Sequence, residues 1–435
     1  MTQLRGVTTT STNSRLPGRP QGAKGAYLRL ISITDTYTLH NFPHVVQAVR
    51  EAREVAARDP EGCVLATTHS GDIVSPTPLT SLDFGKSMIE GLNRVQIDYA
   101  CLGNHEFDLT IGVLQKRIHE FQGTWLNSNI TDPCFTGANG KTLPTYDIIN
   151  VGRRKVAIGG FCTTQSDIYP PGTLRSVVPV NQSVFQTWEQ ATLEDAEAMV
   201  PLTHQSIDED RALIAALHKD PRTRGRMPII LGGHEHEVYE VAEEGGTILK
   251  VGQDAETLGV VDLWWDAAGC LCSGYQLIEA SAFAREPTCD AFVARKEEML
   301  GSMRGVTITH LGEPMSSRGT RQKPEKIARL LCTKIKHSVP GADICILQGG
   351  CVRGKADYAP GSFTYGDLMN ELPFETEICV VRLPGSVIAQ SVANSRSRPD
   401  TEVPTFLHVD EDAEFEAFPS LACRSINGQP FDPEA

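Results

Sequence analysis

The chain has 435 residues, of which 40% are hydrophobic and 22% are charged, and its formal net charge is −14. This length is typical of two or three domains, and the composition is that of a globular protein. The acidic balance argues against non-specific binding of nucleic acid, which needs a basic face. A phosphate site on such a chain would need local positive charge or metal ions.

The first 26 residues predict a disordered leader. They are rich in Thr and Ser and then in Pro, Gly and Arg, which is typical of segments without a packed core. They lack the apolar stretch of a secretory signal, although their Ser- and Arg-rich, acid-free composition is also compatible with an organellar transit peptide. No apolar run reaches the roughly 18 residues of a membrane span. Since no CxxC pair occurs among the twelve cysteines, a reducing compartment fits best. We therefore expect a cytoplasmic protein without a membrane partner.

Apolar runs alternate with helix-like segments between about residues 27 and 265, which predicts an α/β domain. Several of these runs end at residues that can bind metal or phosphate: YLRLISIT before Asp35, CVLATT before His69 and Asp72, DYACL before Asn104 and His105, AMVPLT before His204, and MPIILGG before His234 and His236. In α/β folds, ligands gather beyond the carboxyl ends of the strands.

Local sequence signals predict further helices and strands. Ser206 and Glu209 have the spacing of a capping box at the start of a helix. The segment PTYDIINVGRRKVAIGGF predicts a hairpin with its turn near Gly152. Residues 281–304 are expected to form a connecting helix, and a second α/β unit follows from about residue 305.

The strand ends together indicate a metal site. All of the candidate ligands are oxygen or imidazole donors and none is a thiolate, which favours Zn, Mn, Fe or Co over a Cys-bound structural zinc. They are Asp35, Asp72, Asn104, His204, His234 and His236. A single His after a strand is usually an ordinary loop residue. Five such strand ends in one chain favour a two-metal site, in which a shared carboxylate lies between His and Asn ligands.

Four motifs carry a resemblance to a known family. The stretches GDIVSPTPLTSLDFG, LGNHEFD, THQSIDEDRAL and LGGHEH resemble the metal motifs of calcineurin-like metallophosphoesterases. Their spacing and the second half of the chain resemble the 5'-nucleotidase / UDP-sugar hydrolase family over about residues 27–435. The resemblance implies an α/β fold with a two-sheet αββα metallophosphoesterase domain at 27–280, a connecting helix at 281–304, and a smaller α/β nucleotidase domain at 305–435.

The resemblance also implies roles for the residues of the first domain. One metal would be held by Asp35, Asp72 and His236, and the other by Asp72, Asn104, His204 and His234. His105 and Asp108 match the catalytic dyad of the family, with His105 stabilising charge on the transferred phosphoryl group and Asp108 orienting the imidazole. Glu106 would support the ligands from behind.

In the second domain, SSRGTR and QGGCVRG resemble the arginine segments with which the family clamps phosphate and carboxylate groups, and ELPFET resembles the motif whose aromatic residue stacks on the base. The implied substrate-binding residues are Arg318, Arg321, Gly350, Arg353 and Phe374. Taken singly, each could equally be a surface arginine or a core phenylalanine, but their order along the chain favours binding.

Three departures from the family pattern stand out. Tyr37 occupies the place of a metal-binding His, and a neutral phenol is a poorer ligand than imidazole, so the first metal site is predicted to be weaker, altered or empty. Gln348 replaces an Asn, and Glu375 and Thr376 follow Phe374 where the family has another residue that helps to hold the base. The chain stops at INGQPFDPEA, before the family's second base-stacking aromatic, so the second domain is expected to be truncated.

These observations predict a metal-dependent phosphohydrolase that uses a metal-bound hydroxide and two divalent ions on a small-molecule phosphate ester, with a nucleotide monophosphate as the leading substrate. UDP-sugar cleavage, 2',3'-cyclic phosphodiester cleavage and a sugar-phosphate substrate are the alternatives within this class. An alternative from another class is a catalytically impaired nucleotide-binding protein, which fewer than two bound ions and no turnover would favour.

Overall fold

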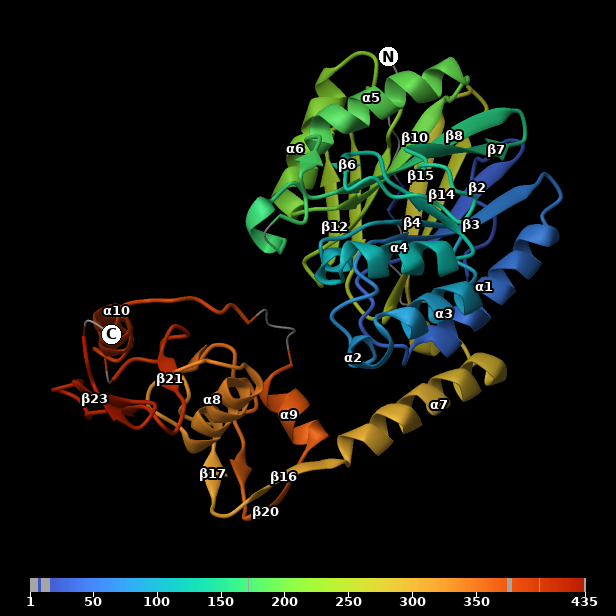
Figure 1. Ribbon diagram of the computed structural model, residues 1–435. Helices are drawn as coiled ribbons and strands as arrows, with labels where there is room; N and C mark the ends of the chain where they lie inside the picture. Colours follow the sequence, from blue (N-terminus) through green and yellow to red (C-terminus); the bar gives the residue numbers. More distant parts are fainter. Residues whose placement is uncertain (1–6, 9–15, 171, 374–377, 399, 434–435) are drawn as a thin grey trace. The chain divides into compact units, whose positions relative to one another are not determined.

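The computed structural model describes residues 7–8, 16–170, 172–373, 378–398 and 400–433. It divides into two compact units, Met1–Glu297 and Glu298–Ala435. The two units are described separately below, and Figure 1 shows the elements of each.

The first unit is built on two β-sheets. The seven-stranded sheet has the order β1-β15-β14-β2-β3-β4-β5. Its strands are β1 Val7–Thr8, β2 Tyr27–Ile33, β3 Cys63–Ser70, β4 Tyr99–Cys101, β5 Thr124–Leu126, β14 Thr257–Trp265 and β15 Leu271–Glu279. Strands β2 to β5 run parallel, while β14 is antiparallel to β2. Every residue of β2 is buried, as expected for a strand covered on both faces.

The six-stranded sheet has the order β12-β13-β11-β10-β8-β7. Its strands are β7 Tyr146–Val151, β8 Arg154–Cys162, β10 Ala198–His204, β11 Ile229–Gly233, β12 Val238–Glu243 and β13 Gly246–Val251. The hairpin expected near Gly152 is confirmed, because Val151 pairs with Arg154 across the turn. Strands β8, β10, β11 and β13 are parallel, so their carboxyl ends meet at one edge of the sheet.

The two sheets pack face to face between outer helices, which confirms the αββα architecture (Figure 1). The core between the sheets joins Leu28 and Leu30 of one sheet to Ile158 and Val200 of the other. The helices of the first unit are α1 Phe42–Ala57, α2 Thr80–Asp83, α3 Lys86–Val95, α4 Ile111–Glu120, α5 Val180–Leu193 and α6 Ile207–Lys219. Helices α5 and α6 pack on the six-stranded sheet, and α1 packs on β3. Short segments are η1 His105–Asp108, η2 Ser166–Ile168, η3 Ala280–Ala282, β6 Ile130–Asp132 and β9 Ser176–Val177.

Part of the segment predicted to be a disordered leader packs against this unit. Ala23 is buried in a small apolar cluster with Tyr27 and Trp264. The guanidinium of Arg29, which is 1% exposed, donates to the carbonyl oxygens of residues 17 and 18 and forms a bidentate pair with Asp262. A buried arginine on β2 thus ties residues 17 and 18 to β2 and to Asp262 of β14.

Helix α7 spans Pro287–Arg304 and contains the boundary between the two units at Glu297 and Glu298; the sequence predicts a connecting helix at 281–304. The other helices of the second unit are α8 Lys326–Ser338, α9 Tyr365–Glu371 and α10 Gly385–Ser395. Its strands are short: β16 Thr307–Leu311, β17 Met315–Ser316, β18 Ile346–Gln348, β19 Asp357–Tyr358, β20 Gly361–Thr364, β21 Leu407–Val409, β22 Glu414–Phe415, β23 Cys423–Ile426 and β24 Gln429–Pro430.

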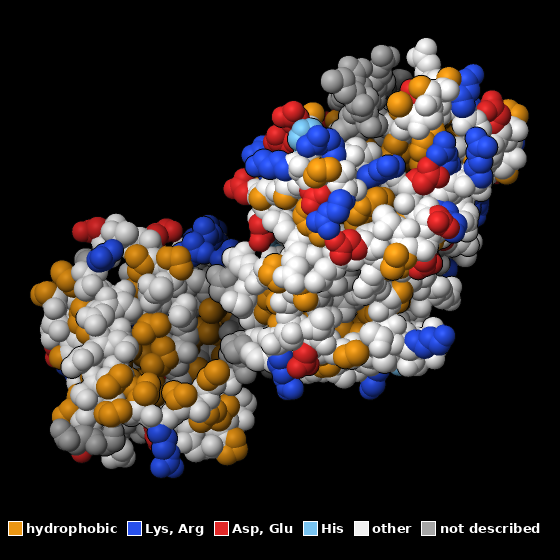
Figure 2. Space-filling model, turned by 90° about the horizontal axis from the view of Figure 1, so that it is seen from above, with side chains coloured by type: hydrophobic (Ala, Val, Ile, Leu, Met, Phe, Trp, Pro, Cys, Tyr) orange, Lys and Arg blue, Asp and Glu red, His pale blue; other side chains and the backbone are white. Residues whose placement is uncertain are grey.

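Hydrophobic side chains are exposed over much of the surface of the second unit in the view of Figure 2. Among the described residues of the second unit, the large hydrophobic side chains with the highest exposed fractions are Val380 at 71% and Val381 at 67%. They lie in a stretch that forms neither helix nor strand, so its apolar residues contribute little to the core. Among the residues that the structure describes, no helix is both long enough and apolar enough to cross a membrane.

Candidate metal centre

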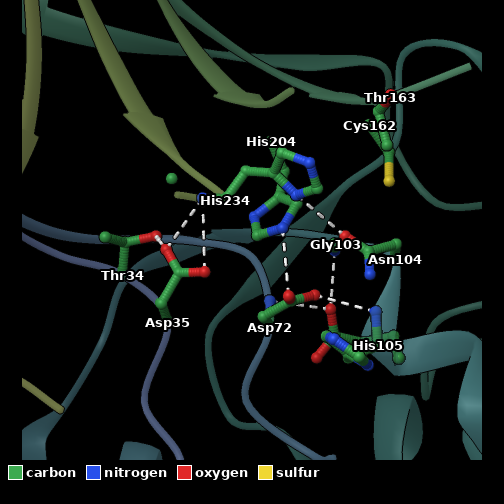
Figure 3. Close-up of polar contacts among 12 residues, drawn as sticks. Thr34, Asp35, Asp72, Gly103, Asn104, His105, Cys162, Thr163, His204 and His234 are labelled. Atoms are coloured by element: carbon green, nitrogen blue, oxygen red, sulfur yellow. Dashed lines mark hydrogen bonds and ion pairs between the residues drawn. The ribbon is translucent and has the colours of Figure 1, made fainter. Parts of the chain in front are cut away.

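The six predicted ligands converge at the carboxyl ends of strands from both sheets. Asp35 follows β2, Asp72 follows β3 and Asn104 follows β4, whereas His204 ends β10 and His234 and His236 follow β11. Figure 3 shows five of them around one space, with the side chains of Asp35, Asp72, Asn104, His204 and His234 directed inward. The two sheets therefore each supply three of the candidate ligands.

The backbone at the ligands is unusual. Four of the six ligands have a positive φ: Asp35 at 48°, Asp72 at 60°, His234 at 100° and His236 at 63°. A non-glycine residue in this region is uncommon, and each such residue costs about 1 kcal/mol or more unless the surrounding structure holds it. Strain of this kind concentrates at functional sites, where the side chains must point to one place.

Glycines next to the ligands allow the loops to approach closely. A Cβ atom on Gly103 would lie 2.1 Å from Oδ1 of Asp72, and one on Gly233 would lie 2.2 Å from Oγ1 of Thr34. Both distances are far below van der Waals contact, so a larger residue would push the ligand loops apart. This explains why glycine directly precedes Asn104 and His234 in the motifs.

The first group of ligands is Asp35, Asp72 and His236, whose donor atoms lie within 4.8 Å of one another. The hydroxyl of Tyr37 lies among them, at 3.3 Å from Asp35 Oδ1, 3.2 Å from Asp72 Oδ2 and 2.7 Å from His236 Nε2. Burial and the charge of Asp72 raise the pKa of Tyr37. The backbone N–H of Tyr37 donates to Asp254 Oδ1 at 2.8 Å, which fixes the turn that carries the phenol.

The second group shows why a cation suits this place. His204 is fully buried, and its Nδ1–H donates to the carbonyl oxygen of Ser70 at 2.8 Å. Its Nε2 faces Asp72 Oδ2 at 3.1 Å. Burial alone would lower the pKa of His204, but the charge of Asp72 is the main influence that raises it to about 10. Nearby, His234 Nδ1 lies 3.1 Å from Asn104 Oδ1. With a pKa of about 10, the ion-free His204 ring also carries a proton on Nε2, which pairs with the Asp72 carboxylate. A divalent ion would replace this proton and bind both atoms, so the residues fit a metal.

Glu106 holds two ligand loops together. Its fully buried carboxylate accepts four backbone N–H groups, from Asp72 at 3.0 Å, Ile73 at 2.7 Å, Val74 at 3.2 Å and Gly103 at 2.6 Å. It therefore fixes the loop after β3 against the loop after β4. This is the supporting position that the sequence predicts for Glu106.

His105 and Asp108 form the hydrogen-bonded pair that the motif predicts. His105 Nδ1–H donates to Asp108 Oδ2 at 2.7 Å, and Ser75 Oγ donates to the same oxygen at 2.9 Å. The backbone N–H of His105 donates to Asp72 Oδ1 at 2.8 Å, which places the ring beside the metal ligands. Burial alone would lower the pKa of His105, but the hydrogen bond to Asp108 and the charge of Asp72 raise it to about 9.

Sequence reasoning missed a lysine behind the histidine ligands. Lys250, on β13, is 1% exposed, and its Nζ donates to the carbonyl oxygens of Gln205 at 2.6 Å and Gly233 at 2.8 Å. It also pairs with Asp210 at 3.1 Å and Glu235 at 2.5 Å. The four partners of Lys250 lie 15 to 45 residues away along the chain. The only local sign of its role was therefore a charged residue inside the apolar strand TILKV.

Four of the five predicted substrate residues of the second unit, Arg318, Arg321, Gly350 and Arg353, lie on two adjacent loops. A Cβ atom on Gly349 would lie 2.0 Å from the carbonyl oxygen of Thr320, so the loop of Arg321 borders the loop of Gly350. Arg353 Nη1 donates to the carbonyl oxygen of Gly350 at 3.3 Å. The exposed Arg318 pairs with Asp357 at 2.6 Å. Phe374, Glu375 and Thr376 lie outside the described residues.

Comparison with known proteins gives the same two parts. Residues 28–238 match the family described as calcineurin-like phosphoesterase, and residues 304–435 match the 5'-nucleotidase C-terminal domain. Among curated proteins, the chain is 22% identical over 355 residues to a snake venom 5'-nucleotidase of Naja atra, covering 72% of this chain and 65% of that protein. It is 24% identical over 380 residues to the 5'-nucleotidase of Homo sapiens, covering 78% of this chain and 64% of that protein.

Solved structures share the fold. The 5'-nucleotidase precursor of Thermus thermophilus matches with a TM-score of 0.60 at 19% identity, and the match covers 94% of this chain and 88% of that one. The NAD nucleotidase of Haemophilus influenzae matches with a TM-score of 0.60 at 15% identity and the same coverage.

The chain spans 65% of the length of the Naja atra protein and 64% of the human one. Residues 28–238 thus belong to the calcineurin-like phosphoesterases, and residues 304–435 belong to the 5'-nucleotidase C-terminal domain family.

Proposed function

We propose that this chain is a metal-dependent phosphohydrolase that removes phosphate from nucleotides, in the manner of a 5'-nucleotidase. The observation that carries the proposal is the buried pair of His204 Nε2 and Asp72 Oδ2, which lie 3.1 Å apart among four further oxygen and imidazole donors. Such a set suits divalent Mn, Zn, Co or Fe. Two divalent ions, when bound, supply Lewis acidity to a phosphate and a nucleophile from water near neutral pH.

In the proposed site, Asp35, Asp72 and His236 would hold one ion, and Asp72, Asn104, His204 and His234 would hold the other, with Asp72 shared. The Asp108 carboxylate keeps the proton of His105 on Nδ1 and orients the ring. The raised pKa of His105, about 9, favours the protonated imidazole at neutral pH, so that Nε2 also carries a proton. That ring can donate a hydrogen bond to the phosphoryl oxygens as their charge develops.

The second unit supports a nucleotide as the substrate. Arg321, Gly350 and Arg353 lie on two adjacent loops, and arginine matches phosphate or carboxylate with paired N–H groups. Arg318 belongs to the same predicted set, and Phe374 is the proposed base-stacking residue. The names of the relatives, which include 5'-nucleotidases and an NAD nucleotidase, favour nucleotides over sugar phosphates. A UDP-sugar and a 2',3'-cyclic nucleotide remain the alternative substrates.

The test is phosphate release from AMP, UDP-glucose, 2',3'-cyclic AMP and an aryl phosphate by chain reloaded with Mn²⁺, Zn²⁺, Co²⁺ or Mg²⁺. The wild-type chain is expected to hydrolyse AMP. The rate of phosphate release by Asp72→Asn should be at least a thousandfold lower, because the substitution removes the shared carboxylate. Asp147→Asn, at an exposed aspartate that contacts Tyr99, is the matched control and should keep the activity.

An impaired nucleotide-binding protein is the competing function, and no comparison supports it. It would require that AMP binds without release of phosphate under any of the four metals. The cytoplasmic location expected from the sequence and the exclusion of nucleic-acid partners stay predictions.

A further inference from the structure

Tyr37 reaches the middle of the first group of metal ligands. Its hydroxyl oxygen lies 2.7 Å from His236 Nε2, 3.2 Å from Asp72 Oδ2 and 3.3 Å from Asp35 Oδ1. A phenol has one proton and can donate it to only one of the two carboxylates, whereas the role of His236 Nε2 depends on the tautomer of its ring. Hydrogen bonding alone therefore leaves at least one carboxylate oxygen beside the phenol oxygen without a proton between them.

The separations match those of donors that surround one ion. Four atoms that bind an ion at about 2.1 Å in a tetrahedron lie about 3.4 Å from one another. Here the three distances from the Tyr37 hydroxyl run from 2.7 to 3.3 Å, and His236 Nε2 lies 3.6 Å from Asp35 Oδ1. The phenol oxygen is thus at the distance of a fourth donor from both carboxylates, and its 2.7 Å to His236 Nε2 is a hydrogen-bond length.

The ring of Tyr37 is held in this position. Its centroid lies 5.0 Å from that of His236 and 6.3 Å from that of His105. The backbone N–H groups of Tyr37 and Thr38 both donate to Asp254 Oδ1, at 2.8 and 3.0 Å. A side chain fixed at both its backbone and its ring has little freedom to leave the ligand group.

We propose that the Tyr37 hydroxyl oxygen is the fourth protein donor of the first metal ion, which makes that site a set of three oxygens and one imidazole nitrogen. This rests on the proposed function, because it presumes that ions bind at the centre. Oxygen donors favour Mn²⁺ and Mg²⁺, whereas imidazole suits Zn²⁺. The tyrosine then does not weaken the first site but sets its preference for an oxygen-seeking ion.

The experiment compares ion content, not activity. Wild type, Tyr37→Phe, Tyr37→His and Tyr99→Phe are stripped with a chelator, dialysed against equal Mn²⁺ and Zn²⁺, and analysed for both metals by mass spectrometry. Tyr99 is the matched control, because its hydroxyl also bonds an aspartate, Asp147, at 3.0 Å. We expect two ions per chain in wild type and Tyr99→Phe, and one in Tyr37→Phe. Tyr37→His should hold two, with the ratio of Zn to Mn raised at least tenfold.

The inference is overturned if Tyr37→Phe holds as many ions as wild type, or more. A gain of an ion in Tyr37→Phe would mean that the phenol blocks the site. If Tyr37→Phe does not fold, as circular dichroism would reveal, Tyr37→His decides, since an unchanged Zn to Mn ratio in that variant also refutes the role. Two ions in wild type without phosphate release from AMP would instead refute the proposed function alone.

Discussion

Replacing Lys250 with Met should destabilise the first unit strongly. The change removes the ammonium group but keeps most of the length of the side chain. Asp210, which is fully buried and pairs with Lys250 at 3.1 Å, would be left as an uncompensated charge. Breaking a buried ion pair from one side costs about 3–5 kcal/mol. For a domain of this size, about 2–4 °C of Tm is lost per kcal/mol, so the Tm should fall by roughly 10 °C.

Differential scanning calorimetry of the chelator-treated chain measures this effect without a contribution from bound ions. Lys155→Met is the control, because Lys155 pairs with the exposed Asp195 at 3.5 Å, and such surface pairs contribute at most about 1 kcal/mol. The double variant Lys250→Met/Asp210→Asn should recover part of the loss, since the orphaned charge is removed. A Tm for Lys250→Met that stays within about 2 °C of wild type, less than the loss expected per kcal/mol, or no recovery in the double variant, would refute the reasoning.

Three further predictions concern the loops and the second unit. Gly103→Ala should lower the affinity for metal ions at least tenfold, measured by competition with a chromogenic chelator, because its Cβ would lie 2.1 Å from Asp72 Oδ1; Gly112→Ala, with open space around it, should not. Glu106→Gln should cost about 2–4 kcal/mol in calorimetry, because an amide nitrogen would face two of the four backbone N–H groups. His408 has a side chain that is buried from water, and its pKa is lowered to about 4, chiefly by burial. The unfolded state, with a pKa near 6.5, binds the proton first as the pH falls, so the contribution of His408 is complete above about pH 6.5 and is lost towards pH 4. This loss, about 3 kcal/mol, should appear as faster hydrogen exchange of peptides around β21 at pH 4.5 than at pH 7, after correction for intrinsic exchange, and should disappear in His408→Gln.

The three predictions fail on separate observations. Equal metal affinity in Gly103→Ala and Gly112→Ala would mean that the loops tolerate a methyl group between them. Wild-type stability in Glu106→Gln would mean that the carboxylate does not hold the two loops. A corrected exchange rate that does not depend on pH, or one that keeps its dependence in His408→Gln, would exclude the buried histidine as its cause.

The candidate metal ligands could be picked out from the sequence because they follow local patterns at strand ends. A buried strand, then glycine, then Asp72, Asn104 or His234 is visible in a short window, and parallel strands bring such positions to one edge. The capping box of α6 is a signal of the same kind, and its two hydrogen-bond partners are present. Patterns of this type depend on residues that are neighbours in the sequence, so contacts with the rest of the chain do not change the local structure that they predict.

The support of the ligands was less predictable, because it comes from distant parts of the chain. The partners of Lys250 lie on a loop, a helix and a strand end between residues 205 and 235. Tyr37 was expected to be a poorer ligand from its chemistry alone, since nothing local shows that its hydroxyl lies among three donors. In the second unit, strands of two to five residues carry too little periodicity to place the arginines from sequence.

The ligand geometry implies that folding and metal binding depend on each other. Four of the six candidate ligands have a positive φ, which raises the free energy of the folded chain. Glu106 and Lys250 offset this cost by fixing the loops through backbone groups. An ion that binds only the folded state adds RT ln(1 + [L]/Kd), or about 2.7 kcal/mol at a hundredfold excess over Kd. Because three of the candidate ligands come from each sheet, that free energy would act across the interface between the sheets, and an ion bound there would stabilise the same packing that positions its ligands.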